Sequence, residues 1–219
     1  AQVKELKTYD KPVMLSYEER NKDAYLQSVQ SVANLIQNKL ADKVVIARSL
    51  SLEFEGTVTS PQVLSHVINE QPESYLFGIE RDDLLFFGAS PERLVKVMNG
   101  HAYSSCIAGS VKRGKTAEED QMLGQELLND SKNLGEHDYV VKMIAETFAK
   151  NCTHFKVPKK PRLLKIRDIQ HLYTPVEGTL LPNATILQLV KDLHPTPALG
   201  GVPRKEALSI IRREESMNR

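Results

Sequence analysis

The sequence predicts an α+β fold, and three observations support this class. Four short apolar runs follow one another between residues 75 and 107, with only short turns between them. The dipeptide Asn99-Gly100, a strong signal for a two-residue hairpin, joins the last two runs. Helical patterns lie before and after the four runs instead of alternating with them, so an antiparallel meander is expected and a βαβ array is not.

Composition and charge restrict the class of protein. The 219 residues include 41% hydrophobic and 26% charged side chains, which fits one globular domain over residues 1–219. No apolar run approaches the ~20 residues of a membrane span, so no membrane partner is expected. With 29 basic and 28 acidic residues the net charge is +1, so no overall field favours nucleic acid.

The cysteines and the N-terminal segment bear on location. Cys106 and Cys152 have no paired metal spacing, and two thiols in a chain of this size fit a reducing compartment. The first residues are charged and include no apolar segment like that of a signal peptide. We therefore expect a cytoplasmic protein.

The first part of the chain predicts a helix, a short strand and a second helix. Residues 17–40 place apolar side chains at steps of three and four, the spacing of one helix face. The β-branched run 43–48 follows, and its period of two puts Lys43 on an apolar face. Ser60-Pro61 then fits an N-cap with proline at the first helical position, opening a helix through residue 68.

Glu92 directly follows the second of four strand-like runs. The runs cover residues 75–79, 84–87, 94–98 and 103–107. We expect Gly88 and Pro91 to fix the turn that carries Glu92. Strand ends often hold catalytic groups, because the loop gives access while the sheet fixes the position. A solvated glutamate in a surface turn is the alternative.

Two helices are predicted after the glycine-bearing segment 108–114. The run Thr116-Ala117-Glu118-Glu119 fits a capping box and opens a helix to about residue 129. Residues 136–149 form the next helix, with Glu136 on the same face as apolar residues at steps of four. A charge on such a face needs a partner or a metal.

The last part of the chain mixes extended, helical and proline-rich segments. An extended run is predicted at 163–172, a helix at 184–193, a loop with three prolines at 194–203 and a helix at 204–215. Such a proline-rich loop is more often a rigid structural turn than a site.

Position alone makes four ionisable residues candidate functional groups: Lys43, Glu92, Glu136 and His171. Each has a structural alternative, since Lys43 can snorkel at a strand edge, Glu136 can pair with a lysine and His171 can be a hydrogen-bonded core histidine. The segment 108–114 could bring backbone amides and Arg113 against an anion, although it lacks the spacing of a P-loop or a dinucleotide site.

Six motifs in a fixed order carry a family resemblance. They are Lys43-Val44-Val45-Ile46-Ala47-Arg48, Ala89-Ser90-Pro91-Glu92-Arg93-Leu94, Ile107-Ala108-Gly109-Ser110 with Arg113-Gly114, Lys132-Asn133 before Glu136-His137, His171-Leu172 with Thr174 and Gly178, and Leu193-His194-Pro195-Thr196-Pro197-Ala198 with Gly200-Gly201 and Pro203-Arg204. Each is weak alone, but together they span nearly the whole chain. On these motifs the chain resembles the chorismate-utilising enzymes, and among them most closely the isochorismate synthases.

The resemblance implies stacked, largely antiparallel sheets flanked by helices, with chorismate and Mg2+ bound in a cleft. In the family's reaction water adds to C2 of the chorismate ring while the C4 hydroxyl leaves, giving isochorismate. Lys43 matches the base that activates the water. Glu92 matches the acid that protonates the leaving hydroxyl, which requires a desolvated carboxyl with a raised pKa.

The resemblance also implies a metal ligand and a substrate pocket. Glu136 matches a magnesium ligand, and Mg2+ accepts a few carboxylates together with substrate oxygens. The positions that match the substrate pocket are Gly109, His171 and Ala198, with Ser110 and Arg113 as further contacts. Glycine at position 109 would let the backbone approach the anionic substrate closely.

The family pattern extends beyond both ends of this sequence. Past Arg219 it continues with a glycine-rich hairpin and a strand that carries the second magnesium-binding carboxylate, and the chain begins inside the family's usual length. We therefore expect a chorismate-binding domain that is incomplete at its C-terminal end and need not be active alone. Exposed sheet edges in such a piece would favour self-association.

Alternatives remain within and outside the family. Salicylate synthase uses a similar lysine and glutamate and then eliminates pyruvate, so it is the nearest rival. Anthranilate synthase is disfavoured because Lys43 resembles the water-using members, and aminodeoxychorismate synthase because Ala108 stands where its covalent lysine is expected. A binding module without turnover is the alternative from another class. The sequence fixes neither the oligomeric state nor the pathway, whether menaquinone, siderophore or salicylate synthesis.

Overall fold

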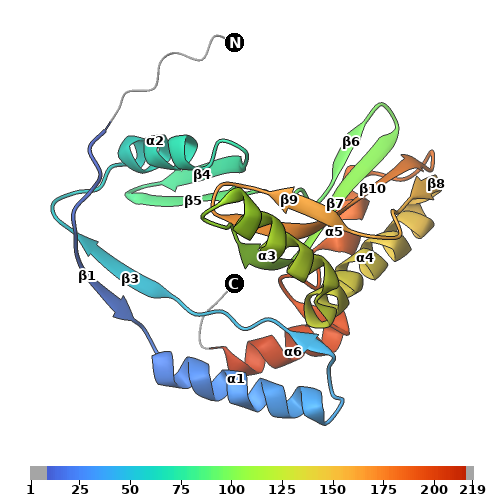
Figure 1. Ribbon diagram of the computed structural model, residues 1–219, viewed down its shortest axis with the longest axis horizontal. Coiled ribbons are helices and arrows are strands. Elements are labelled where there is room, and N and C mark those ends of the chain that lie inside the picture. The colour runs from blue at the N-terminus through green and yellow to red at the C-terminus, as the bar shows by residue number, and fades with distance from the viewer. Residues whose placement is uncertain (1–8, 216–219) are drawn as a thin grey trace. The chain divides into compact units, whose positions relative to one another are not determined.

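The computed structural model describes residues 9–215 (Figure 1). Within that range the chain divides into two compact units. We call residues 9–24 with 48–91 the hairpin unit, and residues 25–47 with 92–215 the sheet unit. Helices and antiparallel sheets occur in the described chain, which confirms the α+β class. One domain over residues 1–219 stays a prediction.

The hairpin unit contains two two-stranded antiparallel sheets and a helix. Its elements are β1 (Met14–Glu19), β3 (Leu50–Phe54), α2 (Ser60–Glu70), β4 (Tyr75–Arg81) and β5 (Leu84–Ser90). β1 pairs with β3, and β4 pairs with β5, which confirms the predicted hairpin. α2 begins after Thr59 with proline in its first turn, so the N-cap lies one residue before the predicted Ser60.

The sheet unit contains a five-stranded antiparallel sheet, a short two-stranded sheet and most of the helices. Its elements are α1 (Lys22–Gln37, which begins in the hairpin unit), β2 (Lys43–Val44), β6 (Lys96–Met98), β7 (His101–Lys112), α3 (Ala117–Asn129), α4 (Ser131–Asn151), β8 (Cys152–Lys156), β9 (Arg162–Lys165), β10 (Ile169–Leu180), α5 (Ile186–Leu193), β11 (Gly201–Val202) and α6 (Arg204–Glu214). The large sheet has the order β6-β7-β10-β8, with β9 also paired to β10, and β11 pairs with β2.

The main core lies between β7, β10 and α4. Alternate residues are buried from Ala102 to Ala108 on β7 and from Gln170 to Gly178 on β10, as expected for strands with one covered face. α4 buries the predicted stripe at steps of four against them. The buried side chains from these three elements include Ala102, Cys106, Ala108, Leu172, Val176, Val140, Ile144 and Phe148. This packing holds β7 and α4 together, and both elements carry candidate site residues.

The prediction of one continuous four-stranded meander is wrong. β4 and β5 pair with each other, whereas β6 and β7 belong to the large sheet. The Asn99-Gly100 hairpin is confirmed, and both residues have positive φ, 52° and 75°. The other edge of β7 pairs with β10, from Lys112 opposite Ile169 to His101 opposite Thr179. A partner from a distant part of the chain, β10, therefore lies beside β7, and β6 forms an edge of the large sheet where the meander would have placed β5.

Several other predicted elements differ in their bounds. The run 43–48 is a strand only over β2, and the run 163–172 breaks at a turn into β9 and β10, where the Ile166 N–H donates to the Ile169 carbonyl at 3.0 Å. α4 begins at residue 131, before the predicted 136, because the Asp130 side chain caps it by accepting from the Asn133 N–H at 2.7 Å. Gly88 lies within β5, opposite Phe77, and so does not form the turn before Glu92.

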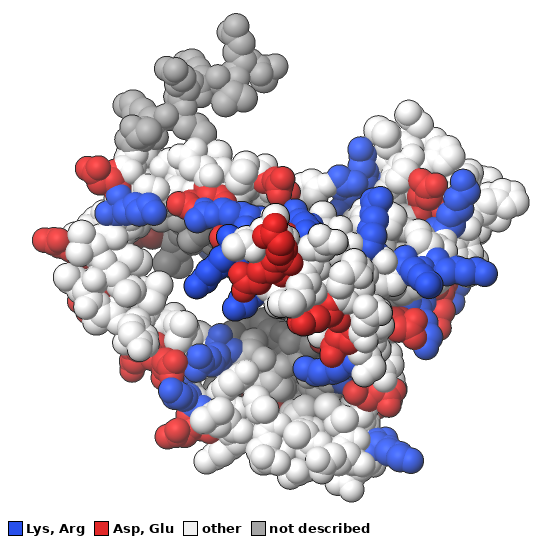
Figure 2. Space-filling model, viewed as in Figure 1, with Lys and Arg blue, Asp and Glu red and all other residues white. Residues whose placement is uncertain are grey.

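Among residues 9–215, no helix is both long enough and apolar enough to cross a membrane. On the face drawn in Figure 2, acidic and basic side chains are intermixed. The expected lack of a nucleic-acid partner and the expected self-association stay predictions.

Candidate active site

Lys43 and Glu136 form an ion pair in the sheet unit. β2 carries Lys43 and pairs with β11, where the Lys43 carbonyl oxygen lies so close to Gly201 that a Cβ at that position would collide with it. The Lys43 side chain is only 14% exposed, and its Nζ lies 2.9 Å from Oε1 of Glu136. The charge on the apolar face of α4 therefore has a lysine partner, one of the alternatives left open by the sequence.

Glu92 is held by β7. The Ser104 hydroxyl donates to the Leu94 carbonyl at 2.6 Å, and the Ser105 N–H donates to the Arg93 carbonyl at 3.2 Å. These two bonds fix the residues immediately after Glu92 against the strand. Its position in the sheet unit thus depends on β7, which follows it in the chain.

Burial raises the pKa of Glu92 to about 7, although the positive charge of Lys43 opposes the shift. The neighbouring Cys106 is fully buried on β7, and burial together with the Glu92 carboxylate raises the pKa of its thiol to about 12. The thiol is therefore protonated and unreactive at neutral pH. Glu92 has the raised pKa that an acid acting near pH 7 needs.

A bulge on β7 lies at three of the predicted pocket residues, Gly109, Ser110 and His171. The register between β7 and β10 shifts between His171 and Tyr173, so that Ala108 and Gly109 both stand opposite the single residue Leu172. Gly109 has φ 79°, a conformation that favours glycine, and a Cβ at this position would be tightly placed, 3.1 Å from Cβ of Asn133.

Ser110 and His171 pair across the same two strands. Oγ of Ser110 lies 2.6 Å from Nδ1 of His171. Burial lowers the pKa of His171, so its ring is neutral at pH 7. A neutral ring and a hydroxyl offer hydrogen bonds without adding charge, which suits the binding of a polar ligand.

Arg113 is engaged by the protein itself. Its guanidinium donates to both carboxylate oxygens of Asp120, at 2.6 and 3.0 Å, and to the Ile166 carbonyl at 2.8 Å. Lys165 also donates to Asp120 at 2.6 Å, and these bonds lower the pKa of the Asp120 carboxyl. The bonds favour a structural role for Arg113, and its contact with substrate stays a prediction.

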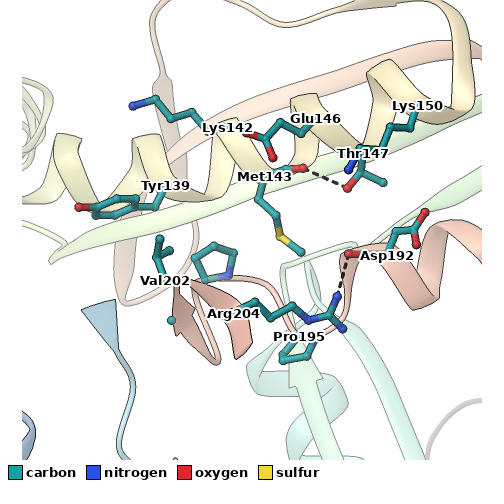
Figure 3. Close-up of a pocket in the computed structure, with 12 residues that line it drawn as sticks. Tyr139, Lys142, Met143, Glu146, Thr147, Lys150, Asp192, Pro195, Val202 and Arg204 are labelled. Carbon is teal, nitrogen blue, oxygen red and sulfur yellow. Dashed lines mark hydrogen bonds between the residues drawn. The ribbon is translucent and has the colours of Figure 1, made fainter. Parts of the chain in front are cut away.

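Ala198 lies in the loop 194–203 and packs against the main core. Arg204 holds this loop by donating to the carbonyls of Asp192, at 3.2 Å, and of His194, which satisfies the C-terminal end of α5. The loop and α4 line an open cavity of about 510 Å³, together with Asp192 and Arg204 (Figure 3). Met143 points into this cavity, and its lining does not include Lys43, Glu92 or Glu136.

The described residues supply at most part of a magnesium site. Between residues 9 and 215 no three His, Cys, Asp or Glu side chains are grouped so that they could hold a metal. Glu136 offers one carboxylate, and Lys43 already neutralises it. These residues do not form a magnesium site by themselves, so no chemical step can be assigned to the ion from this arrangement.

Sequence reasoning missed three residues that support the site. Ser104 anchors the segment after Glu92, Asp120 anchors Arg113, and His137 bonds with both ring nitrogens inside the core. His137 was visible as part of the Glu136-His137 motif, and Asp120 stands in the first turn of a predicted helix. Nothing local in the sequence signals that these polar side chains are buried.

The fold and the site define an α+β protein with a desolvated carboxylic acid that feels the charge of a lysine. The family model of chorismate-binding enzymes matches residues 1–219. The chain belongs to the chorismate-binding enzyme family.

Curated relatives and solved structures agree with the family. The chain is 45% identical to the isochorismate synthase MenF of Bacillus subtilis (strain 168) over 99% of the chain and 46% of that protein. It is 40% identical to the salicylate biosynthesis isochorismate synthase of Pseudomonas aeruginosa over 81% of the chain and 37% of that protein. The structure matches the menaquinone-specific isochorismate synthase MenF of Escherichia coli with a TM-score of 0.88 and 27% identity, over 100% of this chain and 51% of that one. The chain thus spans about half the length of the relatives it matches, or less.

Proposed function

We propose that the protein carrying this chain is an isochorismate synthase that isomerises chorismate to isochorismate. The observation that carries the proposal is the raised pKa of Glu92, about 7, on a carboxyl that feels the charge of Lys43. An acid and an amine with distinct roles are what hydration with loss of a hydroxyl requires. The family and the relatives named as isochorismate synthases support the same reaction.

In the proposed reaction each proton has a defined donor and acceptor. A water oxygen bonds to C2 of the ring as the amine of Lys43 takes a proton from that water. Both ring double bonds shift by one position, from C1–C2 to C1–C6 and from C5–C6 to C4–C5, as the C4–O bond breaks. The protonated Glu92 gives its proton to the departing hydroxyl, which leaves as water. In the structure the Nζ of Lys43 lies 2.9 Å from Oε1 of Glu136, so the proposal requires that Lys43 has left this ion pair and is present as the free amine when it takes the proton from water.

Binding would use the bulge and the strand pair beside it. Gly109 lies on the bulge next to the polar pair of Ser110 and His171, and Ala198 packs against the main core. We assign these four residues to the substrate pocket as part of the proposal. Arg113 joins them only if substrate displaces its bonds to Asp120.

Mg2+ is a further part of the proposal, with Glu136 as its ligand from this chain. A hard cation of this kind binds oxygen ligands and neutralises anionic substrate groups. One carboxylate does not complete such a site, so the remaining ligands would come from substrate, water and other parts of the protein. A cytoplasmic location and use of the product in menaquinone or siderophore synthesis are likewise proposed.

The test measures chorismate consumption by the 219-residue chain and by the full-length protein that contains it, with Mg2+ present and products separated by chromatography. Isochorismate from the full-length protein is the expected product. Salicylate with pyruvate would assign the protein to the rival reaction. No consumption by either form, with chorismate still bound, would replace the proposal with the binding module.

A further inference from the structure

His137 is buried in the core directly after the proposed metal ligand, and both of its ring nitrogens are hydrogen-bonded. The side chain is 3% exposed. Nδ1 lies 3.1 Å from the Ala108 carbonyl oxygen, and Nε2 lies 2.8 Å from Oγ1 of Thr174. The ring therefore joins α4 to β7 and β10 at once.

The partners of the ring determine where its proton lies. The Ala108 carbonyl can only accept, so Nδ1 must carry the hydrogen and donate it. A neutral ring then leaves Nε2 as an acceptor for the hydroxyl proton of Thr174. The structure thus assigns the Nδ1–H tautomer to His137.

The bond to Ala108 falls on the bulge that shapes the proposed pocket. Ala108 and Gly109 are the two residues that stand opposite Leu172, and the carbonyl that His137 binds belongs to the peptide linking them. A bulged residue loses its regular ladder partner, so another group must satisfy its polar atoms. Asn133, one helical turn before His137, packs against Gly109.

We propose that His137 is a positioning residue: its two ring bonds hold the Ala108–Gly109 bulge against α4 and so fix Gly109 relative to Glu136. This rests on the proposed function, because Gly109 and Glu136 are the groups assigned to substrate and metal. Neither ring nitrogen contacts the reacting atoms in this assignment. His137 acts through the two residues whose spacing it sets.

Three variants separate this role from that of an ordinary buried histidine. His137→Asn places an amide N–H where Nδ1 was, so it retains a donor for Ala108 while losing the bond to Thr174. His137→Leu fills the space without a donor. Thr147→Val is the matched control, since Thr147 is also buried on α4 and its hydroxyl bonds only within the helix, to the Met143 carbonyl at 3.0 Å.

The first readout needs no turnover and uses the 219-residue chain. Imidazole nitrogen NMR of the wild-type chain is expected to show His137 with the proton on Nδ1. The Gly109 amide resonance is expected to move in His137→Leu and to stay near its wild-type position in His137→Asn and Thr147→Val. A proton on Nε2, or an unmoved Gly109 resonance in His137→Leu, would overturn the proposal.

The second readout is steady-state kinetics of the full-length protein. In His137→Leu the KM for chorismate is expected to rise about tenfold with kcat changed less, and His137→Asn should recover most of that loss. Thr147→Val should lower thermal stability without changing KM. Equal kinetics in His137→Leu and Thr147→Val would overturn the positioning role. If the wild-type protein does not consume chorismate, the proposed function fails, and the Gly109 resonance alone decides the positioning.

Discussion

Glu92 and Glu136 are the same residue type in the same unit, yet one is desolvated by burial and the other is ion-paired with a lysine. Burial against β7 raises the pKa of Glu92 to about 7. Glu136 is half-buried on α4, with the Lys43 ammonium 2.9 Å from its carboxylate. Lys43 acts on both, since its charge also opposes the rise in the pKa of Glu92. Environment, more than residue type, therefore separates the two carboxyls: burial prepares Glu92 to donate a proton near pH 7, whereas Glu136 is engaged by a lysine.

The largest effect is expected from removing the proton of Glu92. Glu92→Gln in the full-length protein should lower kcat by about 10³, within the range typical of a lost general acid. The exposed Glu126→Gln on α3 is the matched control and should leave kcat unchanged. The measurement is initial-rate isochorismate formation. A variant that keeps a tenth of wild-type kcat would show that Glu92 is not the acid.

Replacing Lys43 tests two of its roles: the proposed base and the charge that lowers the pKa of Glu92. Lys43→Met should lower kcat by at least about 10² through loss of the proposed base. It should also raise the pKa of Glu92 further, because the Lys43 charge lowers it. Carbon NMR titration of the Glu92 carboxyl in the 219-residue chain measures this shift. An unchanged titration would mean that the two groups are not coupled.

The pH dependence of stability should distinguish Glu92 from an ordinary carboxyl. Its pKa in the folded chain is about 7 against an ordinary value of 4.5, so it binds more protons folded than unfolded between these values. Its contribution to stability is therefore fully present below pH 4.5 and is lost as the pH rises through 7. Between pH 5 and pH 8 this loss should reach about 2 kcal/mol in the free energy of unfolding.

Urea denaturation of the wild-type chain and of Glu92→Gln at both pH values measures the difference. Glutamine does not titrate, so the variant should lack this part of the pH dependence. Parallel pH profiles for the two proteins would contradict the raised pKa.

The smallest effect is expected from the anchor behind Glu92. Ser104→Ala removes the hydroxyl that binds the Leu94 carbonyl, at a cost of about 1 kcal/mol in stability. We expect kcat to fall only a few-fold, since the Ser105 N–H still holds Arg93. Ser105→Ala, which retains that backbone bond, is the control. Equal stability of the two variants in urea would argue against an anchoring hydroxyl.

Local signals in the sequence predicted local structure well. The Asn99-Gly100 turn, the apolar stripe of α4 and the Thr116 cap, whose hydroxyl accepts from the Glu119 N–H at 3.2 Å, are all present. Each depends on residues within one or two turns of one another, where propensity and hydrogen-bonding geometry act directly. The capping box is only half formed, because the Glu119 carboxylate accepts from the N–H of Lys115 instead of Thr116.

Long-range pairing escaped prediction for a physical reason. β7 pairs with β10, and β2 pairs with β11, although these segments are far apart in the chain. The period of apolar residues predicts that a segment is a strand, but it does not tell which other strand the segment pairs with. The sequence suggested that Glu136 needs a partner and that Lys43 lies on an apolar face, but no local pattern showed that these two side chains pair with each other. The family resemblance supplied the roles of the site residues, and those roles stay proposals.

The contact between Gly201 and the Lys43 carbonyl has a consequence for variation in this chain. Any side chain at position 201 would push away the two-residue strand that carries the proposed base, although it touches no reacting atom. A variant found there in a genome or an engineering library should lose activity while most of the protein stays folded. The loss of activity in such a variant would come from displacement of the β2 backbone, and not from the loss of a catalytic group.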